Sequence, residues 1–178
     1  MWRSGRKALC VDSAPLEAPL QVTGTPVVTL HVTSDHADGA LFVYLEDVDP
    51  EGQSRYVTEG GLRLLHRRCT ENPDFVQATP YHSFAKADAA PMVPGESAEI
   101  RFELWPTSAR IAAGHRLRLA IAGADADTFD PVPAEGKPTL EVAWGPARPS
   151  RLELPVIDTA AAAEAAATPT RSGDRRRR

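Results

Sequence analysis

Residues 99–104 read Glu-Ile-Arg-Phe-Glu-Leu, and this alternation of polar and apolar side chains decides the fold class. Successive side chains of a β-strand point to opposite faces, so Ile100, Phe102 and Leu104 fall on one face and charged residues on the other. The same period of two recurs at residues 28–32, 41–46, 116–121, 140–144 and 151–156. Such runs are typical of antiparallel sheets with one buried and one wet face.

Turn residues separate these runs. Asp49-Pro50-Glu51-Gly52 predicts a type I turn, and Gly114 precedes a strand at a position where glycine takes positive φ freely. The pair Gly60-Gly61 predicts a hairpin between residues 53–58 and 62–67. Many short strands without intervening helices predict an all-β fold, a jelly-roll β-sandwich that spans residues 1–158.

The last part of the chain differs in composition. Residues 159–167 are rich in alanine, and residues 168–178 are polar and end in four arginines. We expect residues 159–178 to form a disordered tail. The whole chain has a net charge of −4, and residues 171–178 carry +4, so the rest carries −8. An acidic body gives no argument for nucleic-acid binding, and the arginine run is most simply a solvated end.

Length and composition limit the class of protein. A chain of 178 residues with 42% apolar residues is long enough for one domain with its own core. No apolar run approaches the roughly 20 residues that a membrane span requires, and no secretory signal opens the chain. We therefore expect a cytoplasmic protein without a membrane partner, or one whose N-terminal signal lies outside this chain. In either case Cys10 and Cys69 are expected to be free thiols. The sequence leaves open whether the chain forms a homo-oligomer.

No catalytic constellation is recognisable in the chain. The G-x-S-x-G elbow of an α/β-hydrolase is absent, because Ser13, Ser83 and Ser108 all lack the flanking glycines. Dinucleotide, phosphate-loop, C-x-x-C and H-E-x-x-H motifs are absent as well. His115, which follows Gly114, is either a base without a nucleophile or a residue that caps the turn. The sequence therefore predicts no catalytic residue and no cofactor.

An acidic loop is the one candidate for metal binding. Asp125, Asp127 and Asp130 offer the hard oxygen ligands that Ca²⁺ prefers. Their spacing does not complete an EF-hand, because its glycine and its distant bidentate glutamate are missing. The alternative is an ordinary solvated acidic turn.

The strands and turns also occur in a recognisable order, and their amino-acid sequences are recognisable as well. The matching segments are Pro19–Asp35, Leu41–Gly52, Gly60–Arg67, Leu104–Leu119 and Pro149–Pro155. Together they resemble the C-terminal domain of the Xaa-Pro dipeptidyl-peptidase and cocaine-esterase (CocE/NonD) serine hydrolases, from about Leu9 to Val156. The resemblance implies a galactose-binding-like jelly roll that packs on an α/β-hydrolase domain with a Ser-Asp-His triad and helps to wall its active site.

The resemblance carries further expectations. It makes Leu41 and Phe42 candidates for the substrate-pocket wall, with the alternative that Leu41 is core and Phe42 an interdomain contact. It implies that the partner is an α/β-hydrolase domain outside this chain, so that the chain alone is inactive and is a truncated fragment, a split gene product or a late-starting gene model. Two other functions stay open: a stand-alone module that binds carbohydrate or protein, and an interaction protein that works through its arginine tail.

Overall fold

The computed structural model describes residues 8–70 and 73–157, and the regular secondary structure within them is almost wholly β-strand. Its ten strands are β1 (Leu9–Asp12), β2 (Leu20–Gly24), β3 (Val27–Ser34), β4 (Ala40–Val48), β5 (Ser54–Arg63), β6 (Ser97–Glu103), β7 (Thr107–Ile111), β8 (Arg116–Ala122), β9 (Leu140–Ala143) and β10 (Arg151–Glu153). Two single 3₁₀ turns, η1 (Leu64–His66) and η2 (Lys86–Asp88), lie in the connection between β5 and β6. The predicted tail, residues 159–178, lies outside the described residues.

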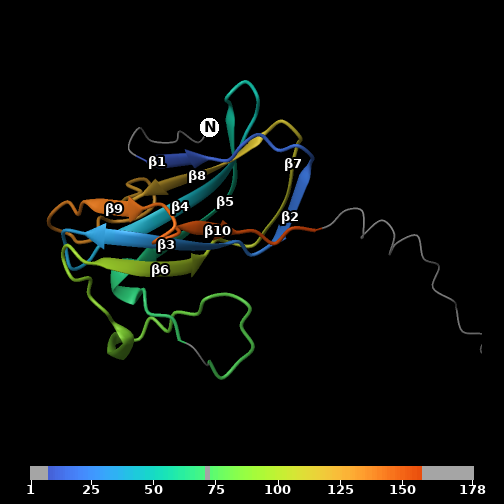
Figure 1. The fold of residues 1–178 in the computed structure, drawn as a ribbon. Helices are drawn as coiled ribbons and strands as arrows, with labels where there is room; N and C mark the ends of the chain where they lie inside the picture. Colours follow the sequence, from blue (N-terminus) through green and yellow to red (C-terminus); the bar gives the residue numbers. More distant parts are fainter. Residues whose placement is uncertain (1–7, 71–72, 158–178) are drawn as a thin grey trace, which may run out of the picture.

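The strands form two main antiparallel sheets, which face each other (Figure 1). The first sheet has the order β1-β8-β4-β5, and the second has the order β10-β3-β6, with β9 also paired to β3. A third sheet consists of β2 and β7 alone. The chain crosses repeatedly from one main sheet to the other, as in a jelly roll. The predicted β-sandwich is therefore confirmed.

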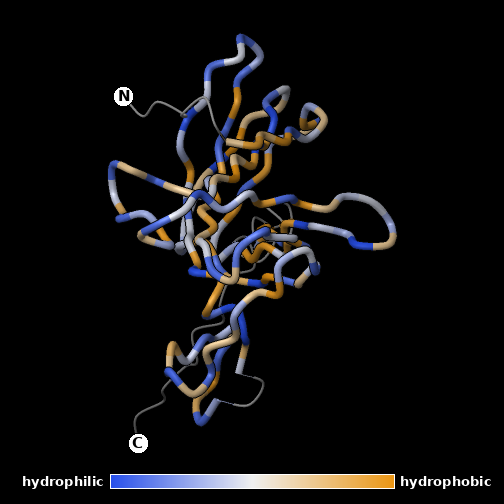
Figure 2. The backbone as a smooth tube through the Cα atoms, turned by 90° about the vertical axis from the view of Figure 1, so that its left-hand side faces the viewer, coloured by the Kyte–Doolittle hydropathy of each residue, from blue (hydrophilic) through white to orange (hydrophobic). Residues whose placement is uncertain are grey.

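The core lies between the two main sheets. It is formed by the apolar side chains that the alternation predicted, and its fully buried members include Val28, Leu30, Val32, Val43, Leu45 and Ile100. The same alternation is visible as switches between hydrophobic and hydrophilic colour along the strands of Figure 2. Burial of these side chains is the main favourable term in folding, at roughly 25 cal/mol per Å² of apolar surface.

The expected hairpin at Gly60-Gly61 is wrong. Both glycines lie inside β5, which runs without a break from Ser54 to Arg63. A Cβ atom on Gly60 would lie 2.5 Å from the carbonyl oxygen of Glu103 and 2.9 Å from the Cα of Leu104. The glycine is therefore needed for close approach of two backbones and not for a turn. The two turns predicted at Gly52 and Gly114 are present, and both glycines have positive φ.

Strand β4 departs from the simple picture of one wet face. Its outer face carries Tyr44 and Glu46, which alternation placed in solvent, yet they are only 5% and 1% exposed. The loop after β8 covers Tyr44, whose hydroxyl donates a hydrogen bond to Asp125 of that loop. Glu46 lies opposite Arg118 of β8 and accepts a hydrogen bond from Ser54. The burial of Tyr44 could not be predicted from the local sequence, because it depends on a loop that is distant along the chain.

The described residues contain no helix that is long and apolar enough to cross a membrane.

The close backbone contact at Gly60 gives a direct test of the β5 assignment. We expect Gly60→Ala to destabilise the domain by about 1–3 kcal/mol, because the new methyl group meets backbone atoms that cannot move independently. Gly123→Ala is the matched control, since its Cβ would lie 3.3 Å from a Leu140 methyl group and no closer than 3.9 Å to a backbone atom, the Ala40 carbonyl oxygen. Urea unfolding of both variants measures the difference, and equal midpoints would show that β5 does not approach Leu104 in this way.

Candidate functional site

The irregular segments of the chain meet at one end of the sandwich, where β4 begins. Ala40 of β4 pairs with Arg63 at the end of β5, and Phe42 pairs with Ala122 at the end of β8. The β3–β4 turn, the connection after β5 and the loop after β8 therefore all start at this place. We call it the loop-bearing end, and define it by residues 35–42, 64–66 and 123–138.

The two pocket-wall candidates lie on opposite faces of β4. Leu41 is 1% exposed and belongs to the core between the sheets. Phe42 lies on the outer face, where its ring stacks on Phe129 at 5.0 Å between ring centroids, with an angle of 24° between the planes. The same ring lies over Gly61, where a Cβ atom would come within 2.9 Å of it. Of the two candidates, only Phe42 thus has its side chain outside the sandwich at the loop-bearing end.

The loop after β8 is anchored to the outer face of the first sheet. The Tyr44 hydroxyl donates to Asp125 Oδ2 at 2.6 Å, and the backbone N–H of Asp127 donates to Asp125 Oδ1 at 3.2 Å. Together with the Phe42–Phe129 stack, these bonds hold the loop above the sheet. They leave a pocket of about 750 Å³ between loop and sheet, lined mainly by alanines and prolines and by Tyr44 and Asp125. An apolar pocket of this size is able to receive a side chain or a small ligand.

The three aspartates of this loop do not form a ligand set in the structure. Asp125 is already engaged by Tyr44 and by the backbone of Asp127. Within residues 8–70 and 73–157, no group of three His, Cys, Asp or Glu side chains is close enough to hold a metal ion. The loop instead uses Asp125 to fix its own position.

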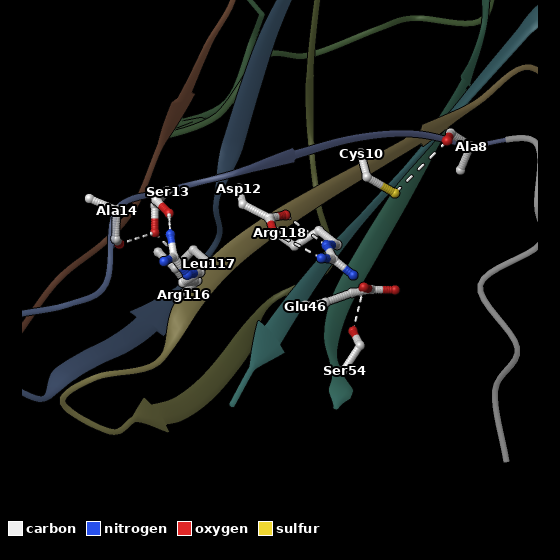
Figure 3. A network of polar contacts seen from close by, with 10 residues as sticks. All are labelled: Ala8, Cys10, Asp12, Ser13, Ala14, Glu46, Ser54, Arg116, Leu117 and Arg118. Carbon is white, nitrogen blue, oxygen red and sulfur yellow. Dashed lines mark hydrogen bonds and ion pairs between the residues drawn. The ribbon is translucent and has the colours of Figure 1, made fainter. Parts of the chain in front are cut away.

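A polar network crosses the rest of the outer face and holds the first strand in place (Figure 3). Arg118 of β8 donates two parallel hydrogen bonds to Asp12 of β1, with Nε–Oδ1 at 2.7 Å and Nη2–Oδ2 at 2.8 Å. Next to this pair, the backbone N–H of Leu117 donates a hydrogen bond to the Ser13 hydroxyl oxygen at 3.0 Å. The Arg118 hydrogen bonds lower the pKa of Asp12, against the smaller opposing effect of burial. Bidentate pairs of this kind give geometric specificity as well as energy.

Negative charge and phenol groups gather near the middle of this face. Partial burial raises the pKa of Glu59 of β5, and the charge of Asp125 raises it further. Burial likewise raises the pKa of Tyr44, and the hydrogen bond to Asp125 adds to the effect. None of the ion pairs found among the described residues involves Glu59 or Asp125. The charge of Asp125 therefore opposes that of Glu59, which lies opposite Tyr44 in the β4–β5 pairing.

The described residues hold no catalytic triad. His115 forms a 2.6 Å contact between Nδ1 and Asp47 Oδ1, so the structure pairs it with a carboxylate near the turn it was expected to cap. No serine hydroxyl in the described part of the chain is hydrogen-bonded to a histidine ring. Cys10 and Cys69 are both free, and burial raises the pKa of the Cys69 thiol, which disfavours a reactive thiolate.

Sequence reasoning missed several residues of this end. Tyr44 was read as an exposed strand residue, and Phe129 carried no signal because it lies in an irregular loop. Both depend on a contact between β4 and residues more than 80 positions away. Phe42 was found through family resemblance and not through alternation. Fold and site together define a β-sandwich domain that carries a structured loop end.

Comparison with known proteins identifies the family. Residues 3–153 match the family described as the X-Pro dipeptidyl-peptidase C-terminal non-catalytic domain, and the chain belongs to that family. It is 52% identical over 152 residues to a protein of Mycobacterium tuberculosis named a putative serine esterase. It is 26% identical over 161 residues to the cocaine esterase of a Rhodococcus species. The chain spans about a quarter of the length of these curated relatives, 24% and 25%, while the matches cover 85% and 84% of the chain.

Solved structures agree with this fold. A CocE/NonD family hydrolase from Staphylococcus aureus matches with a TM-score of 0.71 at 19% identity, over 86% of this chain and 32% of that one. An α-amino acid ester hydrolase matches with a TM-score of 0.67 at 23% identity, over 86% of this chain and 26% of that one. The expected fold and the non-catalytic C-terminal place of this domain in the hydrolase family are therefore confirmed.

The raised pKa of Glu59 makes a pH-dependent prediction for the chain alone. Because the folded state holds the proton more tightly than the unfolded state, stability is highest below the ordinary glutamate range and falls as pH rises through the raised folded pKa. Glu59→Gln removes that loss, so it should be more stable than the parent chain at pH 7. The gain should stay below about 1 kcal/mol, since the group is partly solvated.

Thermal unfolding at pH 7 and at about pH 4, near the ordinary glutamate pKa, measures this effect. The gain from Glu59→Gln should shrink towards zero at the lower pH, where both folded and unfolded carboxyl groups take up protons. Glu141→Gln, at an exposed position of β9, is the matched control. A stabilisation that is equal at both pH values would rule out the electrostatic cause.

Proposed function

We propose that this domain packs on the α/β-hydrolase catalytic domain of a CocE/NonD-type serine hydrolase and walls part of its substrate cleft. The observation that carries the proposal is the placement of Phe42. Its ring stands on the outer face of β4 at the loop-bearing end, fixed between Gly61 below and Phe129 beside it. Leu41 supports this position from the core and does not itself face outward.

The course of the chain supports the same arrangement. In the family this domain is C-terminal, so the catalytic part of a relative leads into the segment that corresponds to β1. Ala8, directly before β1, lines the pocket under the 123–138 loop. The Asp12–Arg118 pair then fixes β1 on β8. A preceding domain attached at this point would lie next to Phe42 and the loop after β8.

The chemistry assigned to each part follows from the residues present. Acyl transfer to a serine requires a nucleophile, a base and an oxyanion hole, which the catalytic domain would supply. This domain would supply an apolar wall that excludes water and limits the shape of the substrate. The mycobacterial relative is named an esterase and others are named dipeptidyl-peptidases, so the substrate class is an ester or a peptide.

A chimeric enzyme tests whether Phe42 forms part of the wall of the substrate cleft. Residues 3–153 replace the matched segment of the mycobacterial relative, and hydrolysis of p-nitrophenyl esters is measured. Phe42→Ala should lower kcat/KM by about tenfold, mainly through KM, because a lost pocket wall weakens the binding of substrate and transition state alike. Phe75→Ala, at an exposed phenylalanine outside residues 35–42, 64–66 and 123–138, is the control and should leave both constants unchanged.

Two results would contradict the proposal. An unchanged KM and an unchanged preference for acyl length in the Phe42→Ala chimera would remove Phe42 from the cleft. Ester hydrolysis by the isolated chain that disappears on substitution of one serine would show that the chain has an active site of its own.

A further inference from the structure

Phe84 has a backbone conformation that phenylalanine seldom adopts. Its φ of 53° is the one positive value at a non-glycine position in the described residues. For a bulky side chain the left-handed region brings Cβ close to the backbone and costs free energy. The side chain gains little burial in return, because Phe84 is 61% exposed. Strain of this kind persists only where the surroundings enforce it, and it marks functional positions more often than chance.

The residues around Phe84 enforce its position. His82 is buried, and its ring nitrogens lie 3.2 Å and 3.0 Å from the carbonyl oxygens of Arg68 and Arg101. On the other side, the Ser83 hydroxyl donates to Asp88 Oδ2 at 2.5 Å and accepts a bond from the backbone N–H of Ala85 at 3.1 Å. Phe84 is thus held between fixed neighbours.

The Phe84 ring rests on two imidazole rings. It packs edge-on against His66 at 5.3 Å between centroids and lies 6.0 Å from the ring of His82. These contacts support one side of the phenyl ring and leave the other side in solvent. An aromatic side chain that is rigid, supported and exposed is the type of residue that dominates protein interfaces.

Phe84 packs on His66, a residue of the loop-bearing end that also carries Phe42. His66 ends the 3₁₀ turn η1, which follows β5 directly at the place where β5 pairs with the start of β4. The backbone N–H of Ala90 donates to the carbonyl of Leu65, and that of Met92 donates to Ala37, at 2.8 Å each. These bonds tie the connection that carries Phe84, seen below β6 in Figure 1, to the loop-bearing end.

We propose that Phe84 is an anchor residue that inserts into an apolar pocket of the α/β-hydrolase catalytic domain and fixes the orientation of this domain on it. The proposal rests on the proposed function and names the catalytic domain as the occupant. Two observations favour that partner: Phe84 packs on His66 of the loop-bearing end, which also carries Phe42, and the family places this domain beside a catalytic one. Backbone strain set before binding leaves less entropy to lose on association.

Phe75 provides a matched control within the same connection. It is 50% exposed, close to the value for Phe84, but its φ is not positive, and its ring packs edge-on against Tyr81 at 4.9 Å. A general effect of removing exposed aromatic surface would appear at both positions. An anchor role would appear at Phe84 alone.

Association is measured between this chain and a tagged mycobacterial relative whose matched C-terminal quarter has been removed, co-expressed and then titrated. Phe84→Ala and Phe84→Gly should each weaken binding by about tenfold or more, as expected for an interface anchor. Phe84→Leu should retain most of the affinity, and Phe75→Ala all of it. Phe84→Gly should also raise the melting temperature of the chain alone, because glycine adopts positive φ without strain.

The chimera gives a second measurement that does not require the shortened relative to fold. There, Phe84→Gly should lower the melting temperature, opposite in sign to its effect on the isolated chain. Parent-level affinity of Phe84→Ala together with an unchanged chimera melting temperature would overturn the anchor role and leave the proposed function standing. No association of the parent chain with a shortened relative that circular dichroism shows to be folded would overturn the proposed function itself. A Phe84-dependent dimer of this chain in sedimentation would assign the anchor to a second copy and overturn the proposal.

Discussion

The structure depends on the burial of one apolar face from each main sheet against the other. Strands β3, β4 and β6 supply most of this layer, with Leu30, Val43 and Ile100 wholly removed from water. Dense packing of such a layer makes the sandwich a rigid support. The loops at the start of β4 are irregular, yet they have fixed positions because each begins or ends on a strand of that support.

Strand β4 is the element that links core and site. Its inner side chains complete the hydrophobic layer, while its outer side chains Tyr44 and Glu46 are buried by polar partners. A buried polar group is costly unless it is hydrogen-bonded, so these contacts specify one position for the loop after β8 and one for β5. Phe42 lies at the start of this strand, so the same contacts hold its backbone in one position. The proposed role as a wall of a substrate cleft needs such a fixed position.

Much of the fold was predictable from local pattern, and the errors have physical causes. Period-two alternation found the main strands because burial of one face acts on each strand separately. Gly60-Gly61 was misread as a hairpin, since glycines serve both tight turns and close backbone approach, and only the position of Leu104 distinguishes the two. The contact of Asp125 with the Tyr44 hydroxyl could not be predicted from the acidic loop, because carboxylates alone do not reveal which groups they bond.

The sequence by itself determined the strands, the β-sandwich class and the absence of a nucleophile elbow, because each follows from residues close together along the chain. Tertiary structure decided which side of β4 Leu41 and Phe42 occupy, how Asp125 is used and why Phe84 is strained and exposed. These features arise from contacts between segments far apart in sequence. Their geometry exists only after the two sheets have packed and brought the loops to one end.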